Sequence, residues 1–317
     1  MKRGDFDLPA YAADRLVECF RRPERPCKLC AQPSRLFDVV DLNKQCHYGL
    51  YPEDIVGIPV YYRRCDVCGL VFTDFFDEFD KDAWTTFVYN EDYRRIDPEF
   101  SHIRPERDAR FVRELLRPYW REGDAGYDYG GGAGVFAERM SQAGMRFRCV
   151  DPFGVDERPE EAGPERFLTS FEVFEHFVDL EASLAEVFGL CRTDEFLAIV
   201  GTKAVPAKLG KGQLSQWYYA GPRNGHITFY TTRSMEIIAQ RLGAEYRAVS
   251  SGMHLFGKGF DLKAISRRAL GLRAMTGLNV RLRRWFGKGR TAWAPAPSQP
   301  IADVETARVG QLKDATP

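Results

Sequence analysis

The hydrophobic pattern between residues 107 and 256 alternates between two periods. Phe111, Val112, Leu115 and Leu116 recur at the spacing of one helix face, which predicts a helix over residues 107–120. Short apolar segments that end in glycine or polar residues follow it and read as strands. Alternating strands and helices predict an α/β fold with a Rossmann-like, doubly wound sheet. The expected strands are Tyr127–Tyr129, Arg146–Asp151, Phe167–Phe171, Glu195–Val200, Glu245–Val249 and Met253–Phe256.

The spacing between the second and third of these strands is unusual. Helices are expected at Val135–Gly144, at Leu180–Leu190 after a capping Asp179, and at Thr232–Leu242. Only fourteen residues, Pro152–Glu165, separate the strand that ends at Asp151 from the next one. A standard doubly wound sheet places a helix, a strand and another helix there. We therefore expect its usual third strand to be missing.

Two C-x-x-C pairs stand out in the first eighty residues. Cys27 and Cys30 form the first pair, and Cys65 and Cys68 form the second. Each pair directs two thiolates at one point, so together they predict a tetrahedral, structural zinc site. Redox dithiols or an iron–sulfur centre are the alternatives, and Cys46-His47 is a possible substitute ligand pair. Short strands expected at Leu36–Leu42, Val60–Arg64 and Leu70–Thr73 make this segment a small zinc ribbon.

A glycine-rich turn follows the first strand of the α/β region. Asp128, Gly130, Gly132 and Gly134 occupy alternate positions, D-x-G-x-G-x-G, directly before an expected helix. Glycines allow a sharp turn and a close approach of the backbone to a ligand. The nicotinamide pattern G-x-G-x-x-G is not met, because Val135 stands at its last position.

Further residues complete a nucleoside-ligand site around this turn. Asp151 ends the second strand, where a carboxylate can accept both ribose hydroxyls. Phe153 is a candidate wall for the adenine base. Glu172, which follows the third expected strand, is also assigned to the cofactor side.

Candidate catalytic residues follow the strand Phe167–Phe171. Glu175 and His176 lie beyond its carboxyl end, where open α/β sheets bind ligands. A histidine can act as a base at neutral pH, so we expect His176, or its rival His226, to remove a proton from the substrate. Glu175 would orient that histidine or hold a substrate hydroxyl. Five aromatic residues are candidate substrate contacts or lid residues, with core packing as the alternative: Tyr89, Tyr93, Trp217, Tyr218 and Tyr219.

Together these motifs resemble class I S-adenosylmethionine (SAM) methyltransferases. The resemblance rests on Asp128–Gly134, Asp151, the segment Phe171–His176 and the segment from Trp217 to Tyr230. The cysteine pairs, with Tyr89-Asn90-x-x-Tyr93, resemble the branch that has an N-terminal zinc ribbon. That branch includes deoxysugar C-methyltransferases and methyltransferases of polysaccharide gene clusters. The resemblance implies SAM as cofactor, structural zinc, and a sugar or glycan as acceptor.

The resemblance and the local composition suggest four regions. Residues 1–80 would form the ribbon, 81–122 connector and lid helices, 123–262 the methyltransferase domain, and 263–317 a basic helical segment with a tail. Lys263–Arg290 carries nine Lys and Arg residues and no acidic residue, a pattern that suits a membrane surface or phosphate groups, or a solvated helix. Its glycines weaken the case for one continuous helix. A linker at 294–300 and a short helix at 301–312 would follow.

Charge and apolar run length narrow the function classes. The 45 Lys and Arg residues balance 45 Asp and Glu residues, so no general affinity for nucleic acid is expected. We see neither a signal peptide nor an apolar run that would span a membrane, and expect a cytoplasmic enzyme. The leading hypothesis is methyl transfer from SAM to a hydroxyl or carbon of a small acceptor. The alternatives are an RNA methyltransferase that uses the ribbon and basic segment, and a non-catalytic SAM-binding interaction module.

Overall fold

The computed structural model describes residues 6–46, 55–159, 163–191 and 193–286. It divides into two compact units, residues 1–272 and residues 273–317. The features discussed below belong to the first unit, apart from the second half of the last helix. The linker and terminal helix expected at 294–312 lie outside the described residues.

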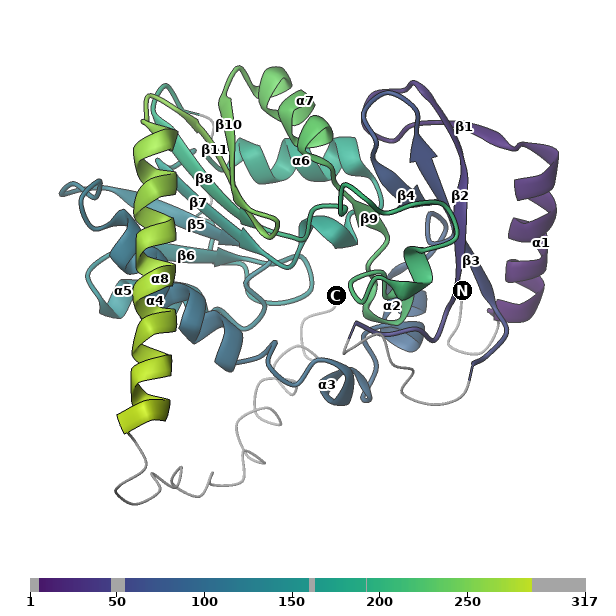
Figure 1. Cartoon of the computed structure of the whole chain (residues 1–317), viewed down its shortest axis with the longest axis horizontal. Coiled ribbons are helices and arrows are strands. Elements are labelled where there is room, and N and C mark those ends of the chain that lie inside the picture. The colour runs from purple at the N-terminus through teal and green to yellow at the C-terminus, as the bar shows by residue number, and fades with distance from the viewer. Residues whose placement is uncertain (1–5, 47–54, 160–162, 192, 287–317) are drawn as a thin grey trace, which may run out of the picture. The chain divides into compact units, whose positions relative to one another are not determined.

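A helix and an antiparallel sheet form the N-terminal part of the chain (Figure 1). The three strands expected around the cysteine pairs are confirmed. Val40, Val60 and Tyr62 are buried in one cluster, and Ala12 of the helix joins them. The sequence pattern did not predict this helix. The elements are α1 (Leu8–Arg21), β1 (Glu24–Pro26), β2 (Pro33–Asp41), β3 (Pro59–Cys65) and β4 (Val71–Thr73).

Three helices connect this sheet to the second one. The first begins after Asp80, whose side chain accepts a hydrogen bond of 2.8 Å from the amide of Ala83. The last buries Val112, Leu115 and Leu116, as the helical spacing predicted. The bounds are α2 (Lys81–Phe87), α3 (Tyr93–Ile96) and α4 (Ile103–Leu116).

The second sheet is the predicted doubly wound sheet. Its order is β10-β11-β8-β7-β5-β6. Strands β6, β5, β7 and β8 run parallel, and β11 is antiparallel to both of its neighbours, β8 and β10. All residues of β8 are buried, as expected for a parallel strand that is covered on both faces. The strands are β5 (Ala125–Tyr129), β6 (Arg146–Val150), β7 (Phe167–Phe171), β8 (Phe196–Gly201), β10 (Glu245–Ser250) and β11 (Met253–Lys258).

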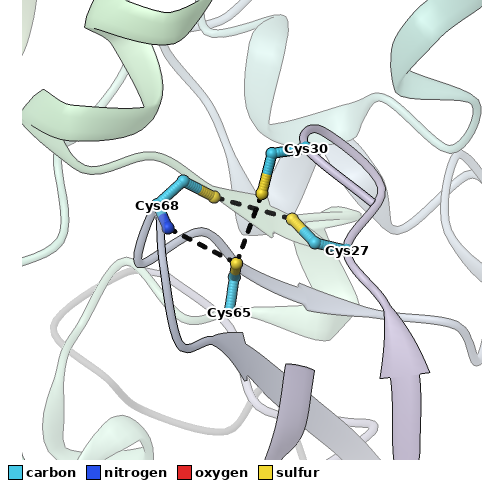
Figure 2. Close-up of side chains that lie close together, drawn as sticks. All are labelled: Cys27, Cys30, Cys65 and Cys68. Atoms are coloured by element: carbon cyan, nitrogen blue, oxygen red, sulfur yellow. Dashed lines mark hydrogen bonds between the residues drawn. The ribbon is translucent and has the colours of Figure 1, made fainter. Parts of the chain in front are cut away.

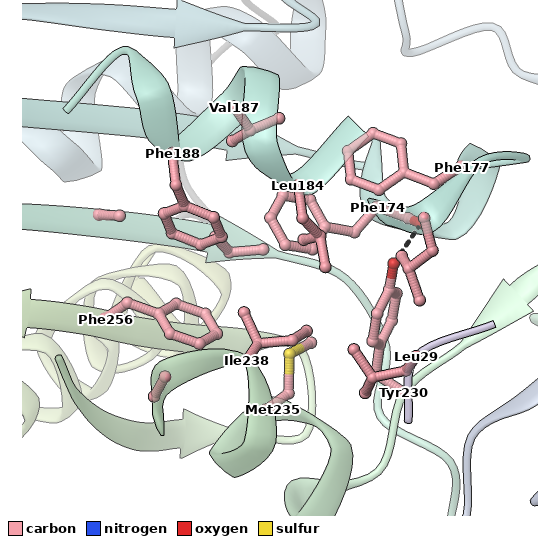
Figure 3. Close-up of a cluster of buried hydrophobic side chains, with 14 of the residues drawn as sticks. Leu29, Phe174, Phe177, Leu184, Val187, Phe188, Tyr230, Met235, Ile238 and Phe256 are labelled. Carbon is pink, nitrogen blue, oxygen red and sulfur yellow. Dashed lines mark hydrogen bonds between the residues drawn. The ribbon is translucent and has the colours of Figure 1, made fainter. Parts of the chain in front are cut away.

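Helices and three short 3₁₀ turns complete the α/β region. Figure 3 shows one buried cluster in which Phe174 and Phe188 face Ile238 and Phe256, with Leu29 of the first cysteine pair at its edge. Leu29 thus ties the cysteine-containing region to the core of the α/β region. The elements are α5 (Val135–Gln142), η2 (Phe174–His176), α6 (Leu180–Gly189), η3 (Leu214–Gln216), η4 (Pro222–Asn224), α7 (Thr232–Leu242) and α8 (Leu262–Phe286).

The second sheet ends at β6, and no further strand lies beside it among the described residues. The chain after β6 folds back instead, through a bridge between Val150 and Asp156. This arrangement agrees with the expectation that the usual third strand is missing.

The two sheets are joined through a two-residue strand, β9 (Thr228–Phe229). It pairs antiparallel with β4, where Val71 faces Phe229 and Phe72 faces Thr228. The segment between β8 and α7 therefore completes the N-terminal sheet (Figure 1).

The helix α8 runs without a break from Leu262 to Phe286, so the expectation that its glycines interrupt it is wrong. Leu262, Ile265 and Ala269 are buried in the core of the first unit, and this packing holds the start of the helix. Within the described parts of the chain, none of the helices combines the length and apolar character that a membrane span requires.

Candidate active site and cysteine cluster

The alternate glycines after β5 adopt the backbone geometry that their pattern predicts. Gly130, Gly132 and Gly134 have φ angles of 77°, 58° and 80°, a region that other residues rarely adopt. A Cβ atom at Gly130 would lie 2.2 Å from Val173 in the loop after β7, whereas one at Gly132 would meet nothing within 4 Å. Helix α5 starts directly after Gly134. The turn therefore contacts the β7 loop on one side and has open space at Gly132, in front of a helix N-terminus.

Asp151 lies beside this turn. One of its carboxylate oxygens accepts a 2.7 Å hydrogen bond from the amide of Gly132, and the other accepts one of 2.7 Å from Phe153. The amide of Val155 in turn donates to the carbonyl of Gly132 at 2.9 Å. The Asp151 carboxylate is thus held next to the glycine turn. The side chain of Phe153 is 60% exposed.

Asp128 supports the turn from within the protein. Its side chain is only 3% exposed and accepts a 2.7 Å hydrogen bond from the Thr169 hydroxyl. The Cα of Gly131 lies so close that a Cβ there would be 2.4 Å from a carboxylate oxygen of Asp128. Burial raises the pKa of Asp128 to about 7. We infer that Asp128 shapes the turn and does not touch the ligand directly.

Two carboxyl groups meet at one tyrosine beyond the end of β7. The Tyr219 hydroxyl lies 3.2 Å from a carboxylate oxygen of Glu172 and donates to Oε1 of Glu175. Burial, together with the nearby Glu175, raises the pKa of Glu172 to about 8, and burial also raises the pKa of Glu175. Two buried carboxyls so close cannot readily ionise together, so the pair retains a proton near neutral pH. Glu172 also has a φ of 55°, and such strained conformations occur often at functional sites.

Two imidazole rings adjoin these carboxyls. His176 Nδ1 lies 3.0 Å from the carbonyl of Gly225, and His226 Nδ1 lies 2.9 Å from the carbonyl of Tyr219. Because a carbonyl only accepts, we assign the proton of each neutral ring to Nδ1, which leaves Nε2 unprotonated. Burial lowers the pKa of His176 to about 4 and that of His226 well below its ordinary value. Both rings are therefore neutral at pH 7. His226 Nε2 lies 3.9 Å from Oε1 of Glu175.

The predicted aromatic residues divide into two groups. The Tyr89 hydroxyl lies 3.2 Å from His176 Nδ1, and its ring contacts those of Tyr93 and Phe153 at 5.2 and 5.8 Å between centroids. Tyr89 thus connects the candidate adenine wall to the candidate base. The rings of Trp217 and Tyr218 contact that of Tyr219 at 5.6 and 6.0 Å between centroids, and Tyr218 is 44% exposed.

The sequence patterns missed the charged residues that hold this site together. The buried ammonium of Lys44, from the N-terminal region, donates to the carbonyls of Trp217 and Ala220 at 3.0 and 2.7 Å. Arg223 donates to the carbonyl of Val88 and to the side chain of Asn90, both at 2.7 Å. These contacts link segments far apart in the chain, so no local spacing points to them.

Comparison with known proteins bears on this site. The family model of a methyltransferase domain matches residues 100–249, which include the glycine turn, Asp151 and both histidines.

Residues 100–249 are similar to methyltransferase domains.

The prediction of a methyltransferase is thereby confirmed, while the acceptor is left open. No curated protein matches the chain.

Several solved structures are similar to parts of the chain. A SAM-dependent methyltransferase from Thermotoga maritima, described as a possible histamine N-methyltransferase, is 14% identical with a TM-score of 0.35, covering 53% of this chain and 95% of that one. Magnesium protoporphyrin IX methyltransferase from Synechocystis, solved with SAH, is 13% identical with a TM-score of 0.38, covering 59% and 97%. An O-methyltransferase family protein from Burkholderia thailandensis is 10% identical with a TM-score of 0.40, covering 57% and 63%.

Outside the methyltransferase domain, the four predicted cysteines converge (Figure 2). The sulfur atoms of Cys27 and Cys68 lie 3.6 Å apart, and those of Cys30 and Cys65 lie 3.5 Å apart. Four sulfur atoms placed about 2.3 Å from a zinc ion form a tetrahedron with edges of about 3.8 Å, close to the observed separations. Cys46 does not join this cluster, since its sulfur lies 3.2 Å from His226 Nδ1. His47 lies outside the described residues.

Backbone amides point at the cluster in the manner of zinc knuckles. The amides of Leu29, Val67 and Cys68 each lie 3.4 Å from a cysteine sulfur, and such bonds stabilise thiolates. All four cysteines are free thiols. The donor set therefore fits a structural zinc ion. Glu175, His176 and His226 form the only other group within the described residues whose ligand atoms lie close enough together to hold a metal, within 4.8 Å.

Proposed function

We propose that this methyltransferase transfers the methyl group of SAM to a hydroxyl or carbon of a small sugar or glycan acceptor. The observation that carries the proposal is the convergence of two carboxyls and two neutral imidazoles beyond β7, beside the glycine turn. Val173, between Glu172 and the η2 turn, contacts that turn at Gly130. The acid–base groups and the cofactor turn are therefore neighbours.

The cofactor side is formed by the turn and by β6. Gly132 and Gly134 let the backbone approach the methionine part, Asp151 accepts the ribose hydroxyls, and Phe153 covers the adenine. When bound, SAM supplies an electrophilic methyl group, so the protein mainly has to align the acceptor and exclude water. Asp128 keeps the turn in shape from below.

On the acceptor side, His176 is the group that we assign as the base. As a whole residue His176 is partly exposed, whereas His226 is buried, and the Nδ1–H of His176 is fixed by the Gly225 carbonyl. In this proposal the unprotonated Nε2 takes the acceptor proton. Glu175, Tyr219 and His226 then keep the neighbouring carboxyl and hydroxyl groups in place.

Glu172 is the second candidate base. Its carboxyl reaches the same tyrosine, and a pKa of about 8 is better matched to proton transfer near neutral pH than a pKa of about 4. The pH dependence separates the two candidates. A base with the pKa of His176 gives a rate that falls only below about pH 5, and a base with the pKa of Glu172 gives a rate that is still rising at pH 7.

The aromatic side chains around these groups suit a sugar. Tyr89 and Tyr93 on one side, and Trp217 and Tyr218 on the other, offer flat apolar faces that pack against the C–H groups of a sugar ring. The tyrosine hydroxyls and the Trp217 indole N–H can bond to its hydroxyls. Neither the balanced charge of the chain nor any stacking motif favours RNA as the acceptor.

For the cysteine cluster we propose one structural zinc ion. Cys27, Cys30, Cys65 and Cys68 would hold it and leave no position open for water or substrate. Its role is to fold the N-terminal sheet. We further propose that the enzyme acts in the cytoplasm, where free thiol clusters persist.

The test combines product analysis with two variants. Purified enzyme is incubated with SAM and a panel of free sugars, sugar nucleotides and glycans, and methylated products are identified by mass spectrometry. With the acceptor known, His176→Gln should lower kcat by about 10²–10⁴, the usual effect of losing a positioned base. SAM affinity should change little.

The pH–rate profiles of His176→Gln and Glu172→Gln decide the assignment. Loss of the acidic limb in His176→Gln supports His176, and loss of a limb near pH 8 in Glu172→Gln supports Glu172. If neither variant loses turnover, methyl transfer at this centre needs no base. If no panel member is methylated although SAM binds, the proposed acceptor class is wrong.

A further inference from the structure

A recess opens at the same sheet edge, close to Thr202 and Tyr219. It is a cavity of about 450 Å³ between the loop after β8, the aromatic segment and the turn between β10 and β11. Because β11 runs antiparallel to β8, the beginning of β11 lies beside the carboxyl end of β8. The size falls in the range of ordinary ligand sites. The residues that matter in its lining are Lys203, Trp217, Tyr218, Ser250, Ser251 and His254.

The cavity has one positive charge and no negative one. None of the residues that line it is acidic. Burial lowers the pKa of His254 to about 4, so this ring is neutral and Lys203 is the only cation in the lining. Among the described residues, the ammonium of Lys203 has neither an ion pair nor a hydrogen bond. By comparison, Lys28 is paired with Asp77 and Lys258 lies 3.5 Å from Asp194.

The backbone holds Lys203 at this place. The amide of Ala204 donates a 2.7 Å hydrogen bond to the carbonyl of Ser251, and that of Val205 donates one of 2.8 Å to Tyr230. The Lys203 ammonium lies 3.1 Å from the position of a Cβ atom on Gly252, so it rests against the turn between β10 and β11. The backbone directly after Lys203 is thus anchored to the turn between β10 and β11 and to the residue that follows β9.

Only two residues separate this cavity from the carboxyl pair. His254 Nε2 lies 3.1 Å from the carbonyl of Thr202, and the Thr202 hydroxyl lies 3.5 Å from that of Tyr219. Tyr219 in turn contacts Glu172 and Glu175. Thr202 and Tyr219 therefore form a single layer between the cavity and the carboxyl pair, and an acceptor bound at the carboxyl pair would lie close to the cavity.

We propose that the cavity is the enzyme's subsite for an anionic group of the acceptor. The acceptor carries a carboxylate or a phosphate that Lys203 binds, while Trp217 and Tyr218 pack against the sugar ring of the acceptor. This inference rests on the proposed function and narrows its acceptor to an acidic sugar. A charge-assisted bond from an ammonium that no protein group uses favours an anion. The pair Glu172 and Glu175 disfavours an anionic group next to it. Lys203 and this carboxyl pair together therefore set the orientation of the acceptor.

The experiment measures binding of three probes by titration calorimetry, without any methylation step. The probes are glucuronate, glucose 1-phosphate and the neutral methyl glucoside. Each is titrated into full-length wild type, Lys203→Gln and the control Lys208→Gln. Lys208 lies in the same loop but is exposed and does not line the cavity. SAM is titrated into all three proteins as a check of the cofactor site.

We expect at least one acidic probe to bind wild type, and Lys203→Gln to weaken it at least tenfold. The control should bind like wild type, and SAM affinity should be equal in all three proteins. Preference for glucuronate identifies a carboxylate acceptor, and preference for glucose 1-phosphate identifies a phosphate. The proposal is overturned if the neutral probe binds as well as both acids, if neither acid binds, or if the two lysine variants behave alike. Absence of SAM binding with intact anion binding would instead count against the proposed function alone.

Discussion

Replacing Gly132 by alanine separates the cost of backbone strain from the loss of ligand space. Gly132 has a φ of 58°, and a Cβ atom there meets no protein atom within 4 Å. Gly144, at the end of α5, has a φ of 81° and equally open surroundings, but it is not part of the turn. A non-glycine residue in this conformation costs about 1–2 kcal/mol. Gly132→Ala and Gly144→Ala should therefore lose similar free energies of unfolding.

SAM binding should distinguish the two variants. The added methyl group of Gly132→Ala projects into the space that we assign to the cofactor, so SAM affinity should fall at least tenfold, or about 1.4 kcal/mol. Gly144→Ala should bind SAM like wild type. Urea denaturation measures the stability loss and titration calorimetry measures the affinity.

A third variant shows how much stability is lost when the added Cβ atom also meets a neighbouring side chain. In Gly130→Ala the new Cβ would lie 2.2 Å from Val173, so this variant should unfold more readily than the other two. The reasoning is refuted if Gly132→Ala binds SAM as well as Gly144→Ala, because the open side of the turn would then not be the cofactor side.

Three further predictions concern the zinc, the cofactor and pH. Metal analysis of the purified protein should find one zinc per chain. Cys68→Ser should lose both the metal and the fold of the N-terminal sheet, which circular dichroism follows. Iron, or two metals per chain, would contradict this prediction. Asp151→Ala should weaken SAM binding 30- to 150-fold, or about 2–3 kcal/mol, because charge-assisted bonds to the ribose are lost. An unchanged Kd by calorimetry would show that Asp151 does not hold the ribose. Burial raises the pKa of Asp128 to about 7, so the folded protein keeps a proton that the unfolded chain loses near pH 4. The contribution of Asp128 to stability therefore falls as pH rises from about 4 to 7. Measured by urea denaturation, Asp128→Asn should gain stability relative to wild type over this pH range. A stability difference between the two proteins that does not vary with pH would argue against the raised pKa of Asp128.

Local patterns predicted most of the elements, because each has its own hydrophobic period. The strand Phe167–Phe171 and the helix Thr232–Leu242 have the predicted bounds. The helix α8 continues through Gly271 because packing of Ile265 and Ala269 in the core of the first unit outweighs the low helix propensity of glycine.

The candidate site was predictable only in part. The glycine turn, Asp151 and the histidines carry local signals, whereas Lys44 and Arg223 act through contacts with residues more than a hundred positions away. The low pKa of His176 could also not be predicted from the sequence. It arises from burial by Tyr89 and the segment around Gly225, and only the folded chain brings these together.

The pairing of β9 with β4 has a consequence for how the chain is made. Residues up to Thr73 leave the ribosome early, but the edge of β4 stays unpaired until Phe229 has been synthesised. At about 5–20 residues per second, this interval lasts on the order of 10 to 30 seconds. During that time the nascent cysteine region exposes a strand edge that invites wrong partners. Early capture of a metal ion by the cysteines would keep this region compact until the missing strand arrives.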